Sequence, residues 1–378
     1  MPIYDLTVTM LSPVHIGTGE ELSPDEYTVR EIGDGQYMLH ALDLGRLLPD
    51  MTGDRRREFD QAVSAASPTM VRRFIDETAD LSRHTRWKAA TNPELHGLYQ
   101  RSLQDPALQL AIHPMTRTGL DARAYIPGSS IKGAIRTAIL QQILDQSPET
   151  ADLLSRRVGR GGQRDVQLVE AEALGHMNQT RRRPEIRADP FRAVRISDCP
   201  LPDVATSVDP VDLVSLRPGR APAGSDTSGI HLFYEMTFSA LDDETIQATG
   251  TLAIASELAT TPARSARRWD FEHCVSRSIS AENILDACRT FYVHRLEEEA
   301  DRVSQARPGL TETYGALLQQ ISDLGDGEAP IRLGRFSHVE CVTLAPPLRR
   351  ASGGNSRGLA AGLLPMGWAK ITLSEPGR

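Results

Sequence analysis

The sequence predicts an α+β protein built on antiparallel sheets. Segments of alternating polarity, typical of strands, occur near both ends of the chain, and segments of helical periodicity lie between them. These segments do not follow the regular strand–helix–strand order that builds parallel sheets. A chain of 378 residues, 40% of them hydrophobic, is long enough for about two domains with substantial cores.

The N-terminal region predicts strands joined by glycine-containing turns. Residues 3–10 alternate apolar and polar side chains, so one face of that strand is expected to be buried. The following turn contains Gly17 and Gly19, which allow close backbone approach or a positive φ, although a plain hairpin turn explains them as well. Two more short strands, 26–32 and 36–42, flank a Gly-Asp-Gly sequence that predicts a hairpin.

The composition then changes, and residues 43–112 predict a helical insertion with many charges. The expected helices are 55–66, 68–81 and 93–110. Further along, 146–190 is polar and rich in arginine and glycine, with a helix expected near 168–177.

The C-terminal half returns to strands around one long helix. We expect strands at 194–198, 203–216, 231–240, 245–255, 331–333 and 364–373, a helix at 281–304, and a flexible glycine loop at 353–362. With a Pro- and Gly-rich loop at 218–228, we expect an N-terminal domain over 1–225 and a C-terminal domain over 226–378.

The most informative segment is 125–137, which predicts a turn that opens a helix. Pro127 and Gly128 interrupt the preceding extended stretch, and we expect Ser129 or Ser130 to cap the helix. The apolar face of this helix consists of Ile131, Ala134, Ile135, Ala138 and Ile139.

Two cations, Lys132 and Arg136, stand in the first two turns of the same helix. Cations are unfavourable near a helix N-terminus unless an anion also lies there, and free N–H groups at a helix start bind phosphate. Solvated side chains on a helix flank are an equally good explanation. The segment is not a Walker P-loop, because Lys132 precedes Gly133.

Composition limits the classes of partner. The net charge of −8 disfavours broad, non-specific nucleic-acid binding but leaves room for a local site. Ten arginines gather between residues 156 and 195, where coding bias and a solvated loop compete with phosphate binding as explanations. No apolar run approaches the ~20 residues of a membrane span and no signal peptide is visible, so we expect a cytoplasmic protein without a membrane partner.

The motifs that carry catalysis or metal binding are missing from the sequence. There is no nucleophile elbow, no His-Glu-x-x-His and no Cys-x-x-Cys, so we expect no catalytic residue, metal or cofactor, and four reduced cysteines. His15 follows a strand beside the glycine turn and could serve as a general acid or base, but the sequence shows no partner for it.

Three segments together resemble one family: residues 13–20, residues 126–136 and the turn 333–336. Their combination is similar to the RAMP superfamily of CRISPR-associated proteins. The chain length, the helical insertion, the segment 189–198 and the ending 364–368 resemble the Csm-type subunit that caps the 3′ end of the guide RNA in type III-A effector complexes.

The resemblance implies two ferredoxin-like (RRM-like) modules, with the helical insertion in the first. It implies a non-catalytic subunit that binds guide RNA (crRNA) by shape and phosphate contacts and supports its maturation in antiviral defence. The implied RNA-binding residues are His15, Gly17, Gly19, Gly128, Ser129, Ser130, Lys132 and Arg136. The implied partners are guide RNA, other Csm-type subunits, especially the backbone RAMP and the small helical subunit, and host trimming nucleases.

One departure and one alternative accompany the resemblance. The C-terminal glycine-rich turn of the family has more than one glycine, whereas Gly334 stands alone here, so this turn could pack against a neighbouring subunit instead of cradling phosphate. The alternative function is that of a related RAMP endoribonuclease, which cleaves repeats in precursor guide RNA and would use His15 as general acid or base.

Overall fold

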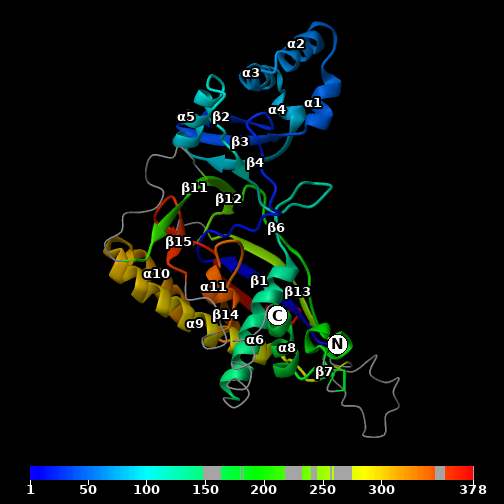
Figure 1. Ribbon diagram of the computed structural model, residues 1–378, viewed down its shortest axis with the longest axis vertical. Coiled ribbons are helices and arrows are strands. Elements are labelled where there is room, and N and C mark those ends of the chain that lie inside the picture. Colours follow the sequence, from blue (N-terminus) through cyan, green and yellow to red (C-terminus); the bar gives the residue numbers. More distant parts are fainter. Residues whose placement is uncertain are drawn as a thin grey trace.

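The molecule is an α+β structure with two main sheets stacked along its long axis (Figure 1). The computed structural model describes residues 1–147, 163–178, 180–181, 183–217, 232–239, 245–255, 258, 275–344 and 354–377. Most strand pairs are antiparallel, which confirms the predicted class, and the parallel pairs are β4–β11 and β5–β12.

The first sheet has the strand order β14-β17-β1-β13-β9, and all its neighbours are antiparallel. Its strands are β1 (Ile3–Met10), β9 (Val194–Ile196), β13 (Gln247–Ile254), β14 (Glu328–Arg332) and β17 (Trp368–Ser374). The expected strand at 3–10 is therefore confirmed and lies at the centre of the sheet. Its apolar side chains Leu6, Val8 and Met10 are completely buried, as their alternation with polar residues predicts.

Helices of the C-terminal half and the helix after Gly128 cover this sheet. They are α6 (Gly128–Asp145), α9 (Ala281–Ala306), α10 (Thr311–Ser322) and α11 (His338–Val342), with the 3₁₀ turn η6 (Pro308–Leu310) between α9 and α10. Figure 1 shows α6 and α9 crossing the same face, and the Tyr292 hydroxyl of α9 donates to the Ala134 carbonyl of α6 at 3.1 Å. The predicted apolar face of α6 is confirmed, since Ile131, Ile135 and Ala138 are completely buried.

The second sheet has the order β16-β15-β11-β4-β3-β2, and in addition β12 pairs with β11 and β5 pairs with β12. Its strands are β2 (Tyr27–Gly33), β3 (Gln36–Leu42), β4 (Thr85–Thr91), β5 (Ile112–His113), β11 (Thr206–Ser215), β12 (Phe233–Thr237), β15 (Ser356–Ala360) and β16 (Leu364–Pro365). The predicted hairpin around Gly33–Gly35 is confirmed as the β2–β3 pair.

The insertion over 43–112 is helical apart from β4, the non-helical stretch 103–111 and the start of β5. Its helices are α1 (Leu44–Asp50), α2 (Gly53–Ser64), α3 (Pro68–Thr78), α4 (Leu81–His84) and α5 (Pro93–Ser102). The helix expected over 93–110 therefore ends early, at Ser102. The prediction of an all-helical insertion is wrong at β4, which pairs antiparallel with β3. The exposure of Arg86 and Lys88 alternates with the partial burial of Thr85 and Trp87, a period of two that the charged composition concealed.

The flexible loop expected at 353–362 is also wrong, because β15 occupies 356–360. Its glycine serves close packing instead of flexibility: a Cβ on Gly358 would lie 2.5 Å from Cδ1 of Phe336. The neighbouring Arg357 is 1% exposed and paired with carboxylates.

Short elements complete the described chain. They are α8 (Gln163–Ala173), β6 (Tyr125–Ile126), β10 (Cys199–Pro200), β7 (Met177–Asn178), β8 (Arg183–Pro184) and the 3₁₀ turns η1 (Ile186–Ala188) and η2 (Pro190–Arg192). The Pro/Gly loop at 218–228 and the first part of the arginine cluster lie outside the described residues. Within the described ranges, no helix is both long and apolar enough to cross a membrane.

The two sheets do not follow the expected division at residues 225 and 226. In the first sheet, β1 pairs with β13 and β17 from beyond that point. In the second, β11 pairs with β12 and β15. Each sheet therefore combines strands from both expected domains. Strands far apart in the sequence pair with one another, and a loop position alone does not predict such pairing.

Candidate nucleic-acid interface

A cavity of about 480 Å³ lies where three distant segments of the chain meet. One wall is the loop that follows β1, with His15, Gly17 and Gly19. A second wall is the start of α6, and a third is the turn after β14, with Gly334 and Arg335. The structure thus brings together the three segments on which the family resemblance depends.

The turn after β14 is hydrogen-bonded directly to the loop after β1. The Arg335 amide donates to the carbonyl oxygen of His15 at 3.0 Å. Gly334 has a φ of 83°, and a Cβ on it would lie 2.1 Å from that same oxygen. Only glycine fits this contact. A single glycine is therefore enough to bring the turn against the cavity, while a phosphate contact of this turn stays a prediction.

His15 is held as a neutral ring on the cavity wall. Its Nδ1 lies 2.7 Å from the carbonyl oxygen of Glu235, which can only accept, so the proton is on Nδ1 and Nε2 carries the free lone pair. Burial lowers the pKa of His15 to about 4. A Cβ on Gly17 would meet Nε2 at 2.8 Å, so a glycine at this position leaves room for the imidazole ring.

Aromatic rings support this wall from behind. Tyr234 lies edge-on to His15 with ring centroids 4.9 Å apart and stacks on His113 at 4.4 Å. The guanidinium of Arg335, an exposed residue, lies 5.7 Å from the centre of the Tyr234 ring. Arg335 is thereby the exposed cation at this cavity.

The start of α6 differs from the prediction. Neither Ser129 nor Ser130 caps the helix: the N-cap residue is Pro127, and the Gly128 amide donates to Oδ1 of Asp198 at 2.8 Å. A Cβ on Gly128 would lie 2.4 Å from the Ile196 carbonyl oxygen, so this glycine lets the helix start against β9. The Asp198 carboxylate therefore supplies the anion that the helix start favours.

The two serines lie inside the first turn of α6. Ser129 is exposed, and Ser130 lines the cavity together with Gly133 and Thr137 of the next turn.

Lys132 and Arg136 point away from the cavity and already have internal partners. The Lys132 ammonium donates to the Val194 carbonyl at 2.7 Å, and burial lowers its pKa. Both carboxylate oxygens of Asp189 accept from Nη1 of Arg136 at 3.0 Å. Protein groups therefore account for both cations without a bound phosphate, while a contact of either with RNA stays a prediction.

Residues 7–220 match the family model described as the RAMP superfamily, which is more than half of the chain. The chain belongs to the RAMP superfamily. This RAMP protein is similar to two curated relatives from strains of Mycobacterium tuberculosis, each described as CRISPR system Cms protein Csm5, at 25% identity over 210 residues. The alignment covers 52% of this chain and 54% of each relative, so the chain spans about half the length of the curated relatives it matches.

Two solved structures share the RAMP fold with a TM-score of 0.66 and 20% sequence identity. One is a cryo-EM structure of a Csm–crRNA–target RNA ternary complex in a type III-A CRISPR-Cas system, matched over 98% of this chain and 100% of the other. The second is a crystal structure of T. onnurineus Csm5, matched over 97% and 99%. At this level of identity the likeness shows the fold alone.

A buried carboxylate links the cavity of this RAMP protein to its second sheet. Glu235, which is completely buried, accepts from the Met115 amide at 2.8 Å and the Thr206 hydroxyl at 2.7 Å, and pairs with Arg117. The guanidinium of Arg117 in turn covers the Trp87 ring of β4 at 3.8 Å. Glu235 also accepts from His15 through its backbone carbonyl oxygen. It therefore fixes the His15 wall of the cavity relative to β4 and β11.

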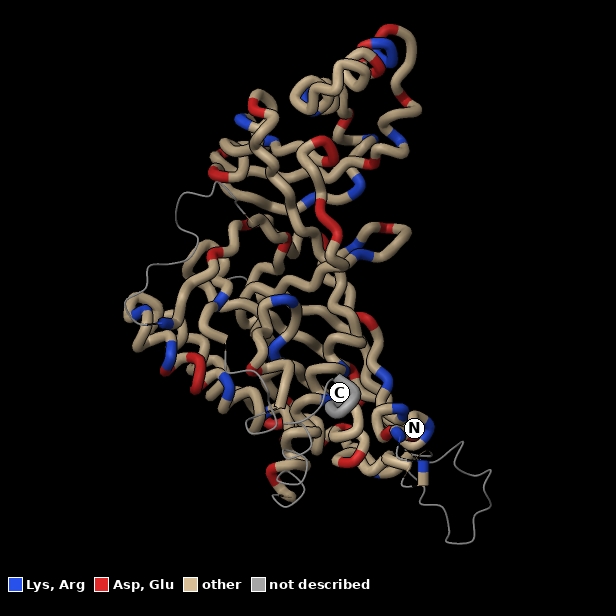
Figure 2. The backbone as a smooth tube through the Cα atoms, viewed as in Figure 1, with Lys and Arg blue, Asp and Glu red and all other residues tan. Residues whose placement is uncertain are grey.

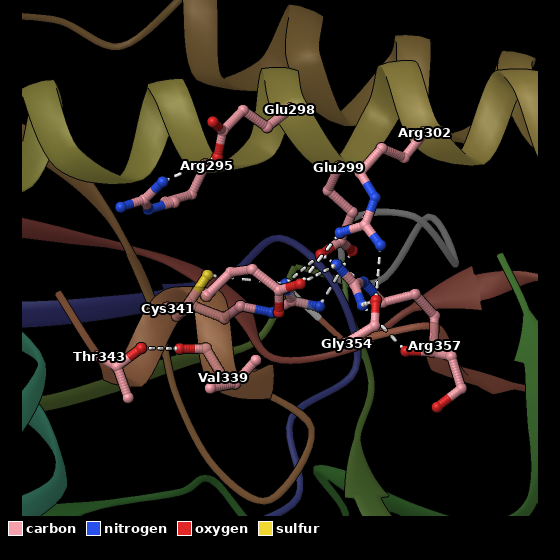
Figure 3. A network of polar contacts seen from close by, with 12 residues as sticks. Arg295, Glu298, Glu299, Arg302, Val339, Cys341, Thr343, Gly354 and Arg357 are labelled. Carbon is pink, nitrogen blue, oxygen red and sulfur yellow. Dashed lines mark hydrogen bonds and ion pairs between the residues drawn. The ribbon is translucent and has the colours of Figure 1, made fainter. Parts of the chain in front are cut away.

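Beneath the Gly334 turn lies a buried ion-pair network (Figure 3). Glu299 of α9 pairs with Arg332 at 2.6 Å and with Arg357 at 2.8 Å, and Glu340 pairs with Arg357 and Arg302. Burial alone would raise the pKa of Glu299, but the two arginines hold it at about 2. Three arginines face two carboxylates, and Arg332 itself lines the cavity, so the network leaves excess positive charge on that side.

Several contributors to this site were beyond sequence reasoning. Arg335 and His113 line the cavity and Glu235 holds His15, and no local spacing connects these three residues. Arg335 had one sequence clue, its position directly after the glycine of a turn. Across the described residues, no cluster of three or more His, Cys, Asp or Glu side chains could hold a metal ion.

Proposed function

We propose that this RAMP protein is a non-catalytic, Csm5-type subunit of a type III-A CRISPR effector complex, and that it caps the 3′ region of the guide RNA. The superfamily match and the relatives named Csm5 support the subunit type. The observation that carries RNA binding is the cavity, where the loop after β1 and the Gly334 turn meet beside the exposed cation Arg335.

The proposed architecture is that of two ferredoxin-like modules. In the first, β1, α6, β9, β13, α9 and β17 follow one another in a β-α-β-β-α-β sequence with the strand order β17-β1-β13-β9. The second module would be built on the second sheet. The helical insertion, which the resemblance implied for the first module, follows β3 and contains β4 of this second sheet, so we assign it to the second module instead.

The RNA would be held without regard to base sequence. The proposed contacts at the cavity are the exposed guanidinium of Arg335, the Ser130 hydroxyl and the backbone around Gly17 and Gly19. Such contacts bind phosphate and sugar but carry no sequence information, which suits a guide of variable sequence. Assembly is proposed with guide RNA and the other Csm-type subunits, the backbone RAMP and the small helical subunit among them, in the cytoplasm, and with host nucleases that trim the RNA.

The test is the replacement Arg335→Gln in the assembled complex, with Arg101→Gln on α5 as the matched control, since both arginines are exposed. The guide RNA is extracted and its 3′ ends are mapped after mild ribonuclease treatment. We expect shortened, unprotected 3′ ends in the Arg335 variant only. Full-length ends in both variants would refute the proposed contact.

One observation favours the alternative of an endoribonuclease: His113 stacks on the same Tyr234 ring that His15 meets edge-on. Against it, His15 is 3% exposed, and a pKa of about 4 makes it a weak base at neutral pH. We therefore expect no cleavage when the purified protein is incubated with repeat RNA without metal. Single-site cleavage that disappears in His15→Ala would establish the enzyme instead.

A further inference from the structure

We propose a second RNA-binding surface on residues 183–195, named the arginine segment, on the other flank of α6 from the cavity. Its arginines are Arg183, Arg187, Arg192 and Arg195, and all four are exposed. It would bind the phosphates of single-stranded RNA that continues from the cavity around the start of α6. This proposal rests on the RNA-binding function proposed above and extends its surface.

The charge of the segment is opposite to that of the whole protein. Four arginines stand against two carboxylates in these thirteen positions, while the chain as a whole carries −8. Lys and Arg gather in Figure 2 around the N-terminus, beside which Figure 1 shows α8 and β7. On the surface of an acidic protein, such a basic patch repels a polyanion less than the rest of the surface does.

The two carboxylates of the segment have partners other than its exposed Arg183, Arg192 and Arg195. Asp189 pairs with Arg136 and accepts from the Phe191 amide at 2.9 Å. Glu185 accepts from the side-chain amide of Asn178 at 3.2 Å.

No carboxylate of the described residues lies within ion-pair distance of Arg183, Arg192 or Arg195. Nη1 of Arg192 donates to the Arg187 carbonyl, whereas the guanidinium groups of Arg183 and Arg195 are free to bind phosphate oxygens, for which their geometry is suited.

The backbone that presents these arginines is fixed by α6 and its neighbours. Lys132 holds the Val194 carbonyl, and Arg136 holds Asp189 while its guanidinium lies 5.0 Å from the centre of the buried Phe191 ring. The Ser276 amide donates to the Ala188 carbonyl at 2.8 Å. Lys132 and Arg136 are therefore positioning residues for the arginine segment. This role explains why two cations stand near the start of α6, although Asp198 already supplies the anion there.

Continuity with the cavity favours RNA over an acidic protein as the occupant. Ser130, which lines the cavity, and Lys132, which touches the segment, are two residues apart on the first turn of α6. An RNA strand that leaves the cavity across the first turn of α6 would meet the arginine segment next. The exposed side chain of Ile186, 77% accessible between Arg183 and Arg187, offers an apolar contact for an unpaired base.

The test uses the full-length chain and fluorescent single-stranded RNAs of about 6 and about 20 nucleotides, which bracket the usual size of one site. The variant is Arg183→Gln with Arg192→Gln and Arg195→Gln. The control is Arg55→Gln with Arg56→Gln and Arg57→Gln, three exposed arginines of α2 that remove the same charge. Affinity is measured over a series of salt concentrations.

We expect the segment variant to bind the short RNA like the wild type and the long RNA about tenfold more weakly. Its plot of log affinity against log salt should become shallower by about 2 for the long RNA, because each single-strand phosphate contact contributes about 0.7 to the slope. Unchanged long-RNA affinity and slope, or an equal loss in the control, would overturn the proposal.

The cavity and the segment can be separated by a further variant. Arg335→Gln should weaken binding of both RNAs, since both occupy the cavity. If Arg335→Gln behaves so and the segment variant does not differ from wild type, only the arginine segment is refuted. If the wild-type protein binds neither RNA, the RNA-binding function and the segment fail together.

Discussion

The amide of Arg335 donates a hydrogen bond to the carbonyl oxygen of His15 at 3.0 Å, and this contact joins two segments far apart in the sequence at the cavity. It brings the turn after β14 against the loop after β1, beside the first turn of α6. The glycines on either side are explained by the same closeness, because Gly17 and Gly334 leave no room for a Cβ.

We predict that Gly334→Ala destabilises the protein by about 1–3 kcal/mol, since a Cβ would collide with the His15 carbonyl at a backbone conformation that side chains rarely adopt. Urea unfolding measures the loss. The matched control is Gly315→Ala in α10, where nothing lies within 4 Å of a new Cβ, and it should gain about 0.5–1 kcal/mol. Equal stability of the two variants would contradict the proposed strain.

We predict a pH dependence that belongs to His15. Its pKa in the folded protein is about 4, below the ordinary value of about 6.5, so the unfolded chain takes up a proton first as the pH falls. Stability is fully present above about pH 6.5 and falls by up to about 3 kcal/mol towards pH 4. The variant His15→Asn should lose this part of the slope in urea unfolding, and an unchanged slope would refute it.

Neutralising Glu299 should destabilise the fold strongly. Glu299→Gln leaves Arg332 and Arg357 buried with less compensation, and loss of one buried partner costs about 3–5 kcal/mol. Because the folded pKa of about 2 lies below the unfolded value of about 4.3, the carboxylate stabilises above pH 4.3 and loses its effect as the pH falls towards 2. The difference in stability between wild type and variant should therefore shrink below pH 4.3, and a constant difference would contradict this assignment.

Asp189→Asn distinguishes charge from positioning in the arginine segment. The change makes the segment more positive, so charge alone predicts tighter binding of the 20-nucleotide RNA. If Asp189 and Arg136 hold the segment in place, binding becomes weaker and the salt dependence shallower. Hydrogen exchange across 187–195 gives a second readout, and tighter binding with unchanged exchange would refute the positioning role.

Much of the local structure followed from sequence patterns. Alternation in 3–10 predicted β1, and helical spacing from Ile131 to Ile139 predicted the buried face of α6. The predictions were wrong where tertiary contacts override the local preference of a segment for helix, strand or cap. At the start of α6, the Asp198 carboxylate accepts from the backbone in place of the expected serine caps. The charged segment 85–91 is a strand because it pairs with β3.

The site was predicted in part, for a physical reason. Gly17, Gly19 and Ser130 stood beside recognisable turns, and the structure brings all three to the cavity. Lys132 and Arg136 are close to them in sequence but lie on another flank of the helix. Arg335 comes from the turn after β14 and Glu235 from β12, and only the folded sheets bring them to His15.

The most direct test of the central claim is a photo-crosslink from the cavity to the guide RNA in the assembled complex. Benzoylphenylalanine is introduced at Val342, an exposed position that lines the cavity, and at Val63 on α2 as the control. The account predicts a crosslink from position 342 to nucleotides in the 3′ region of the guide and none from position 63. Crosslinks from position 342 that reach only protein, or only the 5′ region of the RNA, would contradict it.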